Sequence, residues 1–257
     1  MDEKVLLEAV VLAGEIMLVS GAEVFRVEET MKYMLQRSRY ATREAVVLAT
    51  GIFVTLDDEE KEPLTIAKRI PARSTNVNRI CRVNDISRRF CHEEITVEEA
   101  YAELKKAEKE VLYKPWMKAV GIIGVAASFS FIYGGQLIDL FASALVGVCL
   151  AVSDLLVRKI RLNDFCNSAF CSFTVAFCAM LIEKLFLPSA SADVMIISTI
   201  MNLVPGVTFT TAIRDTLNGD YAAGSARIME AIVVALAVAA GVGFGLVCFR
   251  ALWGGIS

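Results

Sequence analysis

The residues best suited to chemistry lie where an apolar segment is interrupted. Pro205-Gly206 falls in the middle of a run that otherwise has the composition of a membrane helix, and Asn202 precedes it by three residues. Proline removes a backbone hydrogen bond and clashes with the carbonyl group four residues earlier. In hydrocarbon the freed groups need a protein partner or water, so such a break survives only beside protein or a wet cavity. The break alone fits a structural kink and a transport site equally well.

Carboxyl groups in apolar segments are the second candidates. Asp139 begins one such segment and Asp154 lies near its end, while Glu230 is near the start of another. Ionisable groups cost about 2.5–3.5 kcal/mol at the membrane centre on insertion scales, and they usually face a partner or a cavity. A carboxyl group in a low dielectric holds a proton more readily, as a proton-coupled carrier requires. Alternatively, Asp139 and Glu230 are solvated at the lipid headgroups, and Asp154 pairs with Arg158 at the interface.

The distribution of charge divides the chain into two parts. Its 257 residues are 56% hydrophobic, which is too apolar for an ordinary soluble domain of this length. Residues 1–115 carry 18 of the 26 Lys and Arg and 21 of the 29 Asp and Glu, so residues 116–257 keep only 8 of each. We therefore predict a small cytoplasmic α+β domain over residues 1–115 and a bundle of transmembrane helices over residues 116–257. The net charge of −3 gives no reason to expect a nucleic-acid partner.

The membrane part contains five segments that are close to or above the length of a span, which is about 20 apolar residues. They fall near residues 117–133, 137–157, 165–187, 192–213 and 228–249. Basic residues cluster in two of the loops, namely Arg158, Lys159 and Arg161 in one and Arg214 and Arg227 in the other. The positive-inside rule then places the N-terminal part in the cytoplasm, and five crossings leave the C-terminus outside. Small residues recur at every fourth position and predict close helix packing. They are Ser143, Gly147 and Ala151, and Ala237, Gly241 and Gly245.

The N-terminal part offers less chemistry. Its pattern predicts two helices, a β-hairpin and two further helices, at residues 3–19, 21–40, 43–56 with 63–70, 76–91 and 96–110. Glu23, Arg26 and Glu28 could form an ion-pair cluster, either as a surface set or with a function. We find no nucleophile with a base beside it. The seven cysteines contain no C-x-x-C pair and the single histidine completes no zinc pattern, so we expect neither a metal nor a cofactor.

Four blocks of sequence, in order along nearly the whole chain, carry a resemblance to a known family. They are GAEVFRVEETM (Gly21–Met31), STNVN (Ser74–Asn78), Gly134-Gly135 with Asp139, and VPGVT (Val204–Thr208) followed by AIRD (Ala212–Asp215) and Gly219-Asp220. The chain resembles the threonine/serine exporter family, specifically its N-terminal half. The resemblance implies a bacterial inner-membrane exporter driven by the proton gradient. Its substrates would be threonine and serine, or a dicarboxylate such as succinate.

The resemblance also suggests partners. Full-length members of the family carry about ten membrane segments, so this chain looks like the larger subunit of a split, two-subunit exporter. The implied partner is a small membrane protein of four or five helices, and a homo-oligomer is also compatible with the sequence.

The resemblance implies roles for several residues. Asn202, Pro205, Gly206 and Thr208 would line the substrate site. Arg214 and Asp215 would form an ion pair that gates access or contacts substrate. Asp139 is the first candidate for proton coupling; Glu230 is the second and rests on the burial argument alone. Glu23, Arg26 and Glu28 match the family motif and would act as a cytoplasmic gate or regulatory contact. The alternatives are a membrane-anchored hydrolase with its site in residues 1–115, and an accessory scaffold for a partner transporter.

Overall fold

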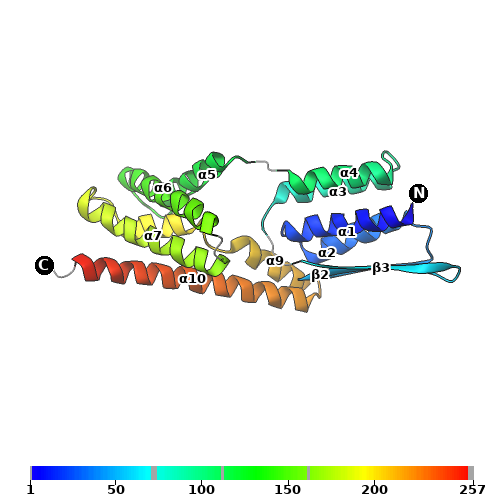
Figure 1. Ribbon diagram of the computed structural model, residues 1–257. Coiled ribbons are helices and arrows are strands. Elements are labelled where there is room, and N and C mark those ends of the chain that lie inside the picture. The colour runs from blue at the N-terminus through cyan, green and yellow to red at the C-terminus, as the bar shows by residue number, and fades with distance from the viewer. Residues whose placement is uncertain (1, 71–73, 111–112, 161–162, 254–257) are drawn as a thin grey trace. The chain divides into compact units, whose positions relative to one another are not determined.

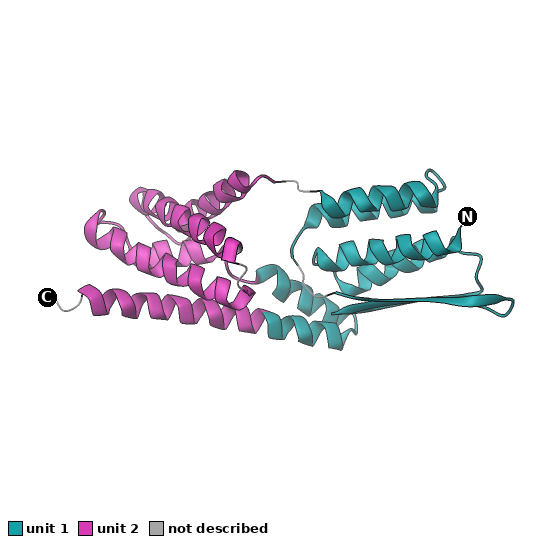
Figure 2. Ribbon diagram, viewed as in Figure 1, with its two compact units in different colours: residues 1–110, 206–230 teal, residues 111–205, 231–257 magenta. Residues whose placement is uncertain are grey.

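The structure, a computed structural model, describes residues 2–70, 74–110, 113–160 and 163–253. The chain forms two compact units (Figure 2). Unit 1 contains residues 1–110 and 206–230, and unit 2 contains residues 111–205 and 231–257. The compact units group residues 206–230 with the N-terminal part. The boundary at 115/116, which the sequence places between a cytoplasmic and a membrane part, stays a prediction.

Unit 1 is layered around its first helix. Helix α1 (Glu3–Val19) lies between a three-stranded sheet and a pair of helices, α3 (Val77–Cys91) and α4 (Val97–Lys109) (Figure 1). Residues on nearly every side of α1 are buried, as expected of a helix covered on opposite faces. Helix α2 (Val24–Leu35) buries the apolar stripe of Val27, Met31 and Met34. Thr96 and Glu99 form a capping box at the start of α4.

The sheet corrects one element of the prediction. Instead of a hairpin of residues 43–56 and 63–70, the structure has three antiparallel strands, β1 (Thr42–Leu48), β2 (Gly51–Asp58) and β3 (Lys61–Arg69), in the order β1-β2-β3. A turn at Ala49 and Thr50 divides the expected first strand. The composition of residues 43–56 does not indicate this turn, because apolar and β-branched residues continue on both sides of it. Ala45, Val47, Ile52 and Val54 alternate inward and are buried.

Unit 2 is helical where the structure describes it. It contains α5 (Pro115–Ile132), α6 (Leu137–Ile160), α7 (Asp164–Leu185), α8 (Ala192–Ile200) and the second part of α10 (Tyr221–Trp253). Among the described residues, four helices are long and apolar enough to cross a membrane, at Pro115–Ile132, Leu137–Val157, Asp164–Leu185 and Tyr221–Trp253. The side chain of Arg158 and all of Arg161 lie outside the described residues, so neither the pairing of Asp154 with Arg158 nor the full basic loop is tested here.

The expected segment 192–213 is a broken helix. Helix α8 has 9 residues, and after a turn at residues 201–205 helix α9 (Gly206–Leu217) adds 12. The break at Pro205 is confirmed. Neither helix reaches by itself the ~20 residues that a membrane span requires. That five segments cross the membrane therefore stays a prediction.

The spacing of small residues is explained by close helix approaches. A methyl group at Gly241 in α10 would overlap the Ser172 hydroxyl and the Ala169 carbonyl oxygen of α7. One at Gly147 in α6 would lie 3.1 Å from the Cβ atom of Ala126 in α5. These contacts lie within unit 2, so the expected close packing is confirmed inside this chain.

We expect Gly241→Leu to destabilise the protein, because α7 and α10 must separate to admit the side chain. Overpacking of this kind costs about 1–3 kcal/mol. Gly243→Leu is the matched control, since nothing lies within 4 Å of a Cβ atom there. Thermal unfolding of the purified variants in detergent measures both. Equal midpoints for the two variants would contradict this packing.

Candidate functional site

A buried ion pair organises the part of unit 1 that follows the helix break. The Arg227 guanidinium, at the start of α10, lies 3.1 Å from the Asp215 carboxylate of α9, measured from Nε to Oδ2. Asp215 is fully buried and Arg227 is 2% exposed. Arg227 also donates from Nη2 to the Ala22 carbonyl oxygen at 2.6 Å, and Asp215 accepts from the Val24 amide at 3.0 Å. The pair thus ties α9 and α10 to the turn between α1 and α2.

Burial raises the pKa of the Asp215 carboxyl, and the charge of Arg227 together with the Val24 amide opposes that rise. A carboxylate and a guanidinium removed from water together need such hydrogen bonds, because desolvation otherwise outweighs their attraction. The turn supplies the backbone groups: Gly21, with φ of 86°, turns the chain so that Ala22 and Val24 follow.

The short connection between α9 and α10 holds the two partners at this distance. Gly219, with φ of 91°, makes the turn, and the Asp220 side chain caps α10 by accepting from the Ala223 amide at 2.9 Å. Gly224 lets the helices approach closely, since a methyl group there would overlap the Thr216 hydroxyl.

The sequence motifs predicted the participants but not their pairing. Arg214 and Asp215 do not pair with each other. The Arg214 guanidinium donates to the Glu23 carboxylate at 2.6 Å, whereas the Asp215 carboxylate pairs with Arg227. Neighbouring residues of a helix point in different directions, which separates the two side chains. Glu23 also pairs with Arg26 at 3.4 Å. Glu23 and Arg26 therefore form part of the expected cluster.

Glu28 has a different place. Its carboxylate accepts from the Val47 amide on strand β1 at 2.9 Å, and lies 3.5 Å from Lys32 on its own helix. It therefore satisfies a backbone donor at an edge of the sheet, where an unpaired donor would otherwise be left.

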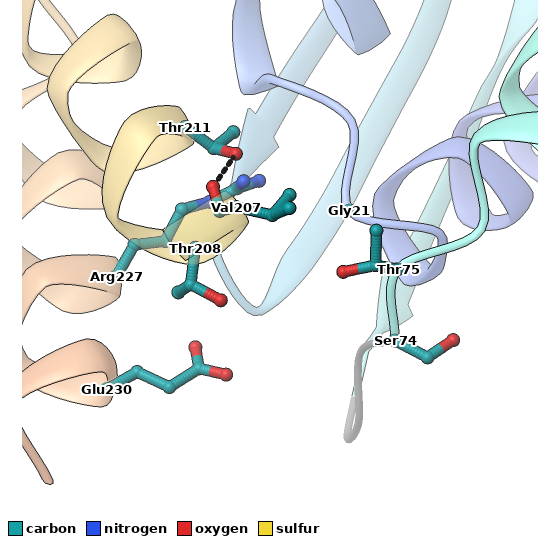
Figure 3. Close-up of a pocket in the computed structure, with 8 residues that line it drawn as sticks. All are labelled: Gly21, Ser74, Thr75, Val207, Thr208, Thr211, Arg227 and Glu230. Carbon is teal, nitrogen blue, oxygen red and sulfur yellow. Dashed lines mark hydrogen bonds between the residues drawn. The ribbon is translucent and has the colours of Figure 1, made fainter. Parts of the chain in front are cut away.

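A cavity of about 140 Å³ lies beside the buried pair (Figure 3). It is lined by residues from α9, α10 and two N-terminal segments: Gly21, Ser74, Thr75, Val207, Thr208, Thr211, Arg227 and Glu230. Thr208 and Glu230 project toward the segment that carries Ser74 and Thr75. Thr211 instead donates to the Val207 carbonyl oxygen at 2.6 Å. The cavity therefore offers hydroxyl groups and one carboxylate, which suit a small polar molecule with a cationic group.

The structure brings together Thr208 and Glu230, two of the predicted site residues. The sequence reasoning did not assign a role to Ser74, Thr75 or Thr211. The motif Ser74–Asn78 was a signal for the first two, since it already carried the family resemblance. The predicted roles of all these residues stay predictions.

Asp139 lies in unit 2 with both oxygens engaged. Its carboxylate accepts from the Gln136 amide and from the Ser191 amide, each at 2.7 Å, and the residue is 4% exposed. It thereby joins the start of α6 to the residue that caps α8. These contacts are not those of the solvated headgroup carboxylate considered above, and they give Asp139 a structural task.

Asn202 also lies in unit 2, at the helix break. Its side-chain amide donates to the Ile122 carbonyl oxygen at 3.3 Å and to that of Thr199 at 3.2 Å. These bonds occupy carbonyl groups beside the interruption, as the break requires in an apolar setting. Pro205 and Gly206 mark the boundary between the units, with Gly206 opening α9.

We expect Asp215→Asn to lower the free energy of unfolding by about 3–5 kcal/mol, because it removes the carboxylate charge that pairs with the buried Arg227 guanidinium. Arg214→Gln is the matched control at the next residue. Its pair with Glu23 is exposed on the arginine side, so little change is expected. Denaturant unfolding of the two variants makes the comparison. Equal stability would show that the buried pair does not hold this region together.

We expect Asp139→Asn to lower stability by about 1–3 kcal/mol, because asparagine has one acceptor oxygen for two amide donors. Asp193→Asn, an exposed carboxylate in the first turn of α8, is the control and should change little. Thermal unfolding and metabolite efflux should be measured on the same variants. Unaltered stability with abolished efflux would argue for the proton-carrier role instead.

Comparison with known proteins places the chain in a family. A family model described as "Putative threonine/serine exporter" matches residues 8–249. The "Probable threonine/serine exporter" of Mycobacterium tuberculosis is 20% identical over 238 residues, covering 92% of this chain and 45% of the relative. The "Pheromone-regulated membrane protein 10" of Eremothecium gossypii is 26% identical over 247 residues, covering 93% and 32%. The protein of the same name from Pichia sorbitophila is 24% identical over 249 residues, covering 93% and 24%.

The chain thus spans between 24% and 45% of the length of these curated relatives. No solved structure matches it significantly. The match of the family model covers most of the chain, including both the N-terminal helices and the helix break. The chain belongs to the threonine/serine exporter family, which is a family of transporters and not of enzymes.

Proposed function

We propose that this chain is part of a membrane exporter of small polar metabolites, with threonine and serine as the first candidate substrates. The family match over residues 8–249 and the name of the Mycobacterium tuberculosis relative support this proposal. Four helices of sufficient length and hydropathy agree with a membrane location. The observation that carries the proposal further is the cavity beside the buried pair, which Thr208 and Glu230 both line.

The cavity is the proposed substrate site. At about 140 Å³ it is smaller than the ~300–1,000 Å³ typical of drug-sized ligands, so it suits a single small metabolite. The charge of Arg227 is balanced by Asp215. Glu230 forms no hydrogen bond or ion pair with another described residue, so its carboxylate sets the charge that a ligand meets.

That charge favours an amino acid over a dicarboxylate. Glu230 attracts the ammonium group of threonine or serine and repels a dianion such as succinate. The hydroxyl groups of Thr208 and Thr75, which point toward each other across the cavity (Figure 3), can donate to the substrate carboxylate and accept from a substrate hydroxyl. We therefore rank threonine and serine above succinate for this chain.

Proton coupling would follow from the same carboxylate. A proton on Glu230 removes the charge that holds the substrate ammonium, so proton and substrate bind in alternation. Exclusive occupancy of one group, together with access of the site to each side of the membrane in turn, would link an inward proton to an outward substrate. Glu230 is exposed, so the burial argument for it does not hold. We propose it for this role because both oxygens of Asp139 already accept backbone amides.

The remaining expectations concern location and partners. We propose a bacterial cytoplasmic membrane with the N-terminal part in the cytoplasm, on the basis of the basic residues in the predicted loops. We also propose a second membrane part of four or five helices, as a separate small subunit.

We expect Thr208→Val and Glu230→Gln to reduce export of labelled threonine and serine at least tenfold, as the loss of a hydrogen bond to a charged group would do. Thr210→Val is the control on the same helix turn, because its hydroxyl donates to the Val207 carbonyl oxygen and does not line the cavity. Efflux is measured from cells that express the complete transporter, with labelled threonine, serine and succinate. Export by Thr208→Val at the rate of Thr210→Val would refute the site, and preferential export of succinate would refute the substrate class.

A further inference from the structure

A second pocket lies in unit 2, where α7 and α10 end. Its volume is about 410 Å³, and its wall includes Glu183 and Lys184 of α7 and Phe249, Arg250 and Trp253 of α10. The pocket shares no residue with the cavity beside Asp215 and Arg227. It therefore requires its own explanation.

Two cations face this pocket from different helices. Lys184 and Arg250 are both exposed, and neither forms a hydrogen bond or ion pair with another residue that the structure describes. The acidic neighbour Glu183 is engaged, because its carboxylate accepts from the Ala192 amide at 3.1 Å. Two positive groups outnumber one carboxylate, so the pocket attracts an anion.

Aromatic rings form the other side of the pocket. Phe249 and Trp253 stack with centroids 5.1 Å apart and planes 11° apart, and Phe177 packs on Phe249 edge-on at 5.8 Å. This makes a firm apolar wall beside the two cations. Tryptophan at the end of a membrane helix is typical of the headgroup level of a bilayer.

We propose that this pocket binds the phosphate group of an anionic phospholipid. Arginine presents a fork of donors that matches phosphate oxygens, and lysine adds a point charge. Basic pockets between membrane helices bind lipid headgroups on the cytoplasmic side, and we propose the same chemistry for this pocket, which the predicted topology places on the opposite side. Leu185, Phe186 and Leu252 lie beside the pocket residues in sequence and are exposed by 53%, 69% and 62%. They offer apolar surface for the acyl chains, which a free phosphate ion would not use.

Trp253 provides a direct reporter, because the chain has only two tryptophans. The variant Trp116→Phe leaves Trp253 as the single tryptophan in the purified full chain, and its fluorescence is excited selectively over that of tyrosine. It is reconstituted into vesicles of phosphatidylcholine that contain dibrominated phosphatidylglycerol or, in parallel, dibrominated phosphatidylcholine. Bromine quenches the indole on contact, so the two quenching curves give the relative affinity of the two headgroups.

We expect the phosphatidylglycerol to bind at least roughly threefold more tightly near Trp253, since each nearby cation favours an anionic lipid. Lys184→Gln together with Arg250→Gln should bring the ratio close to one. Lys118→Gln, which removes a cation of α5 that lines a different pocket, should leave the ratio unchanged. Equal quenching by the two lipids in the Trp116→Phe protein would overturn the proposal.

Added inorganic phosphate separates the two sources of the anion. At constant ionic strength, the preference for phosphatidylglycerol should survive millimolar phosphate. If phosphate abolished the preference, the site would serve a free anion and the lipid proposal would be wrong. Because the readout is fluorescence and not transport, its outcome is independent of the proposed export function.

Discussion

The buried pair of Asp215 and Arg227 is the constraint on which the rest of unit 1 depends. Removing two charges from water is costly, and the cost is offset only when both are paired and hydrogen-bonded. The Ala22 carbonyl and the Val24 amide supply those bonds, so the turn after α1 and the α9–α10 hairpin must stay together. The cavity follows directly from this arrangement, because Gly21 and Arg227 form part of its wall. The same contact thus positions side chains that line the cavity.

The helix break at Pro205 also shapes the cavity. A helix that begins anew at Gly206 carries Val207, Thr208 and Thr211 along its first turns, and these residues line the cavity. On the other side of Pro205, the Asn202 side chain occupies two carbonyl groups beside the interruption. The break is therefore stabilised within unit 2, and the helix that follows it lines the cavity of unit 1. The interpretations as a kink and as a site, which the sequence left open, are compatible with each other.

The sequence revealed the features that depend on local chemistry. Pro205 marked the interruption, Thr96 with Glu99 marked a helix start, and the small residue Gly241 marked a close helix contact. It did not reveal the turn at Ala49 and Thr50, because the apolar pattern runs through it. Nor could it assign Arg214 to Glu23, since 191 residues separate the two and only the folded chain brings them together. The pairing of Asp215 with Arg227, and with it the cavity, depends on the same long-range packing.

The central claim is that Glu230 binds either a proton or the substrate ammonium. Calorimetry of threonine binding in buffers of different ionisation enthalpy measures it most directly, because the difference in heat counts the protons exchanged. We predict that threonine binding by the wild type releases protons in part of the pH range, and that binding by Glu230→Gln releases none. Threonine binding by the wild type without proton release at any pH would contradict the account.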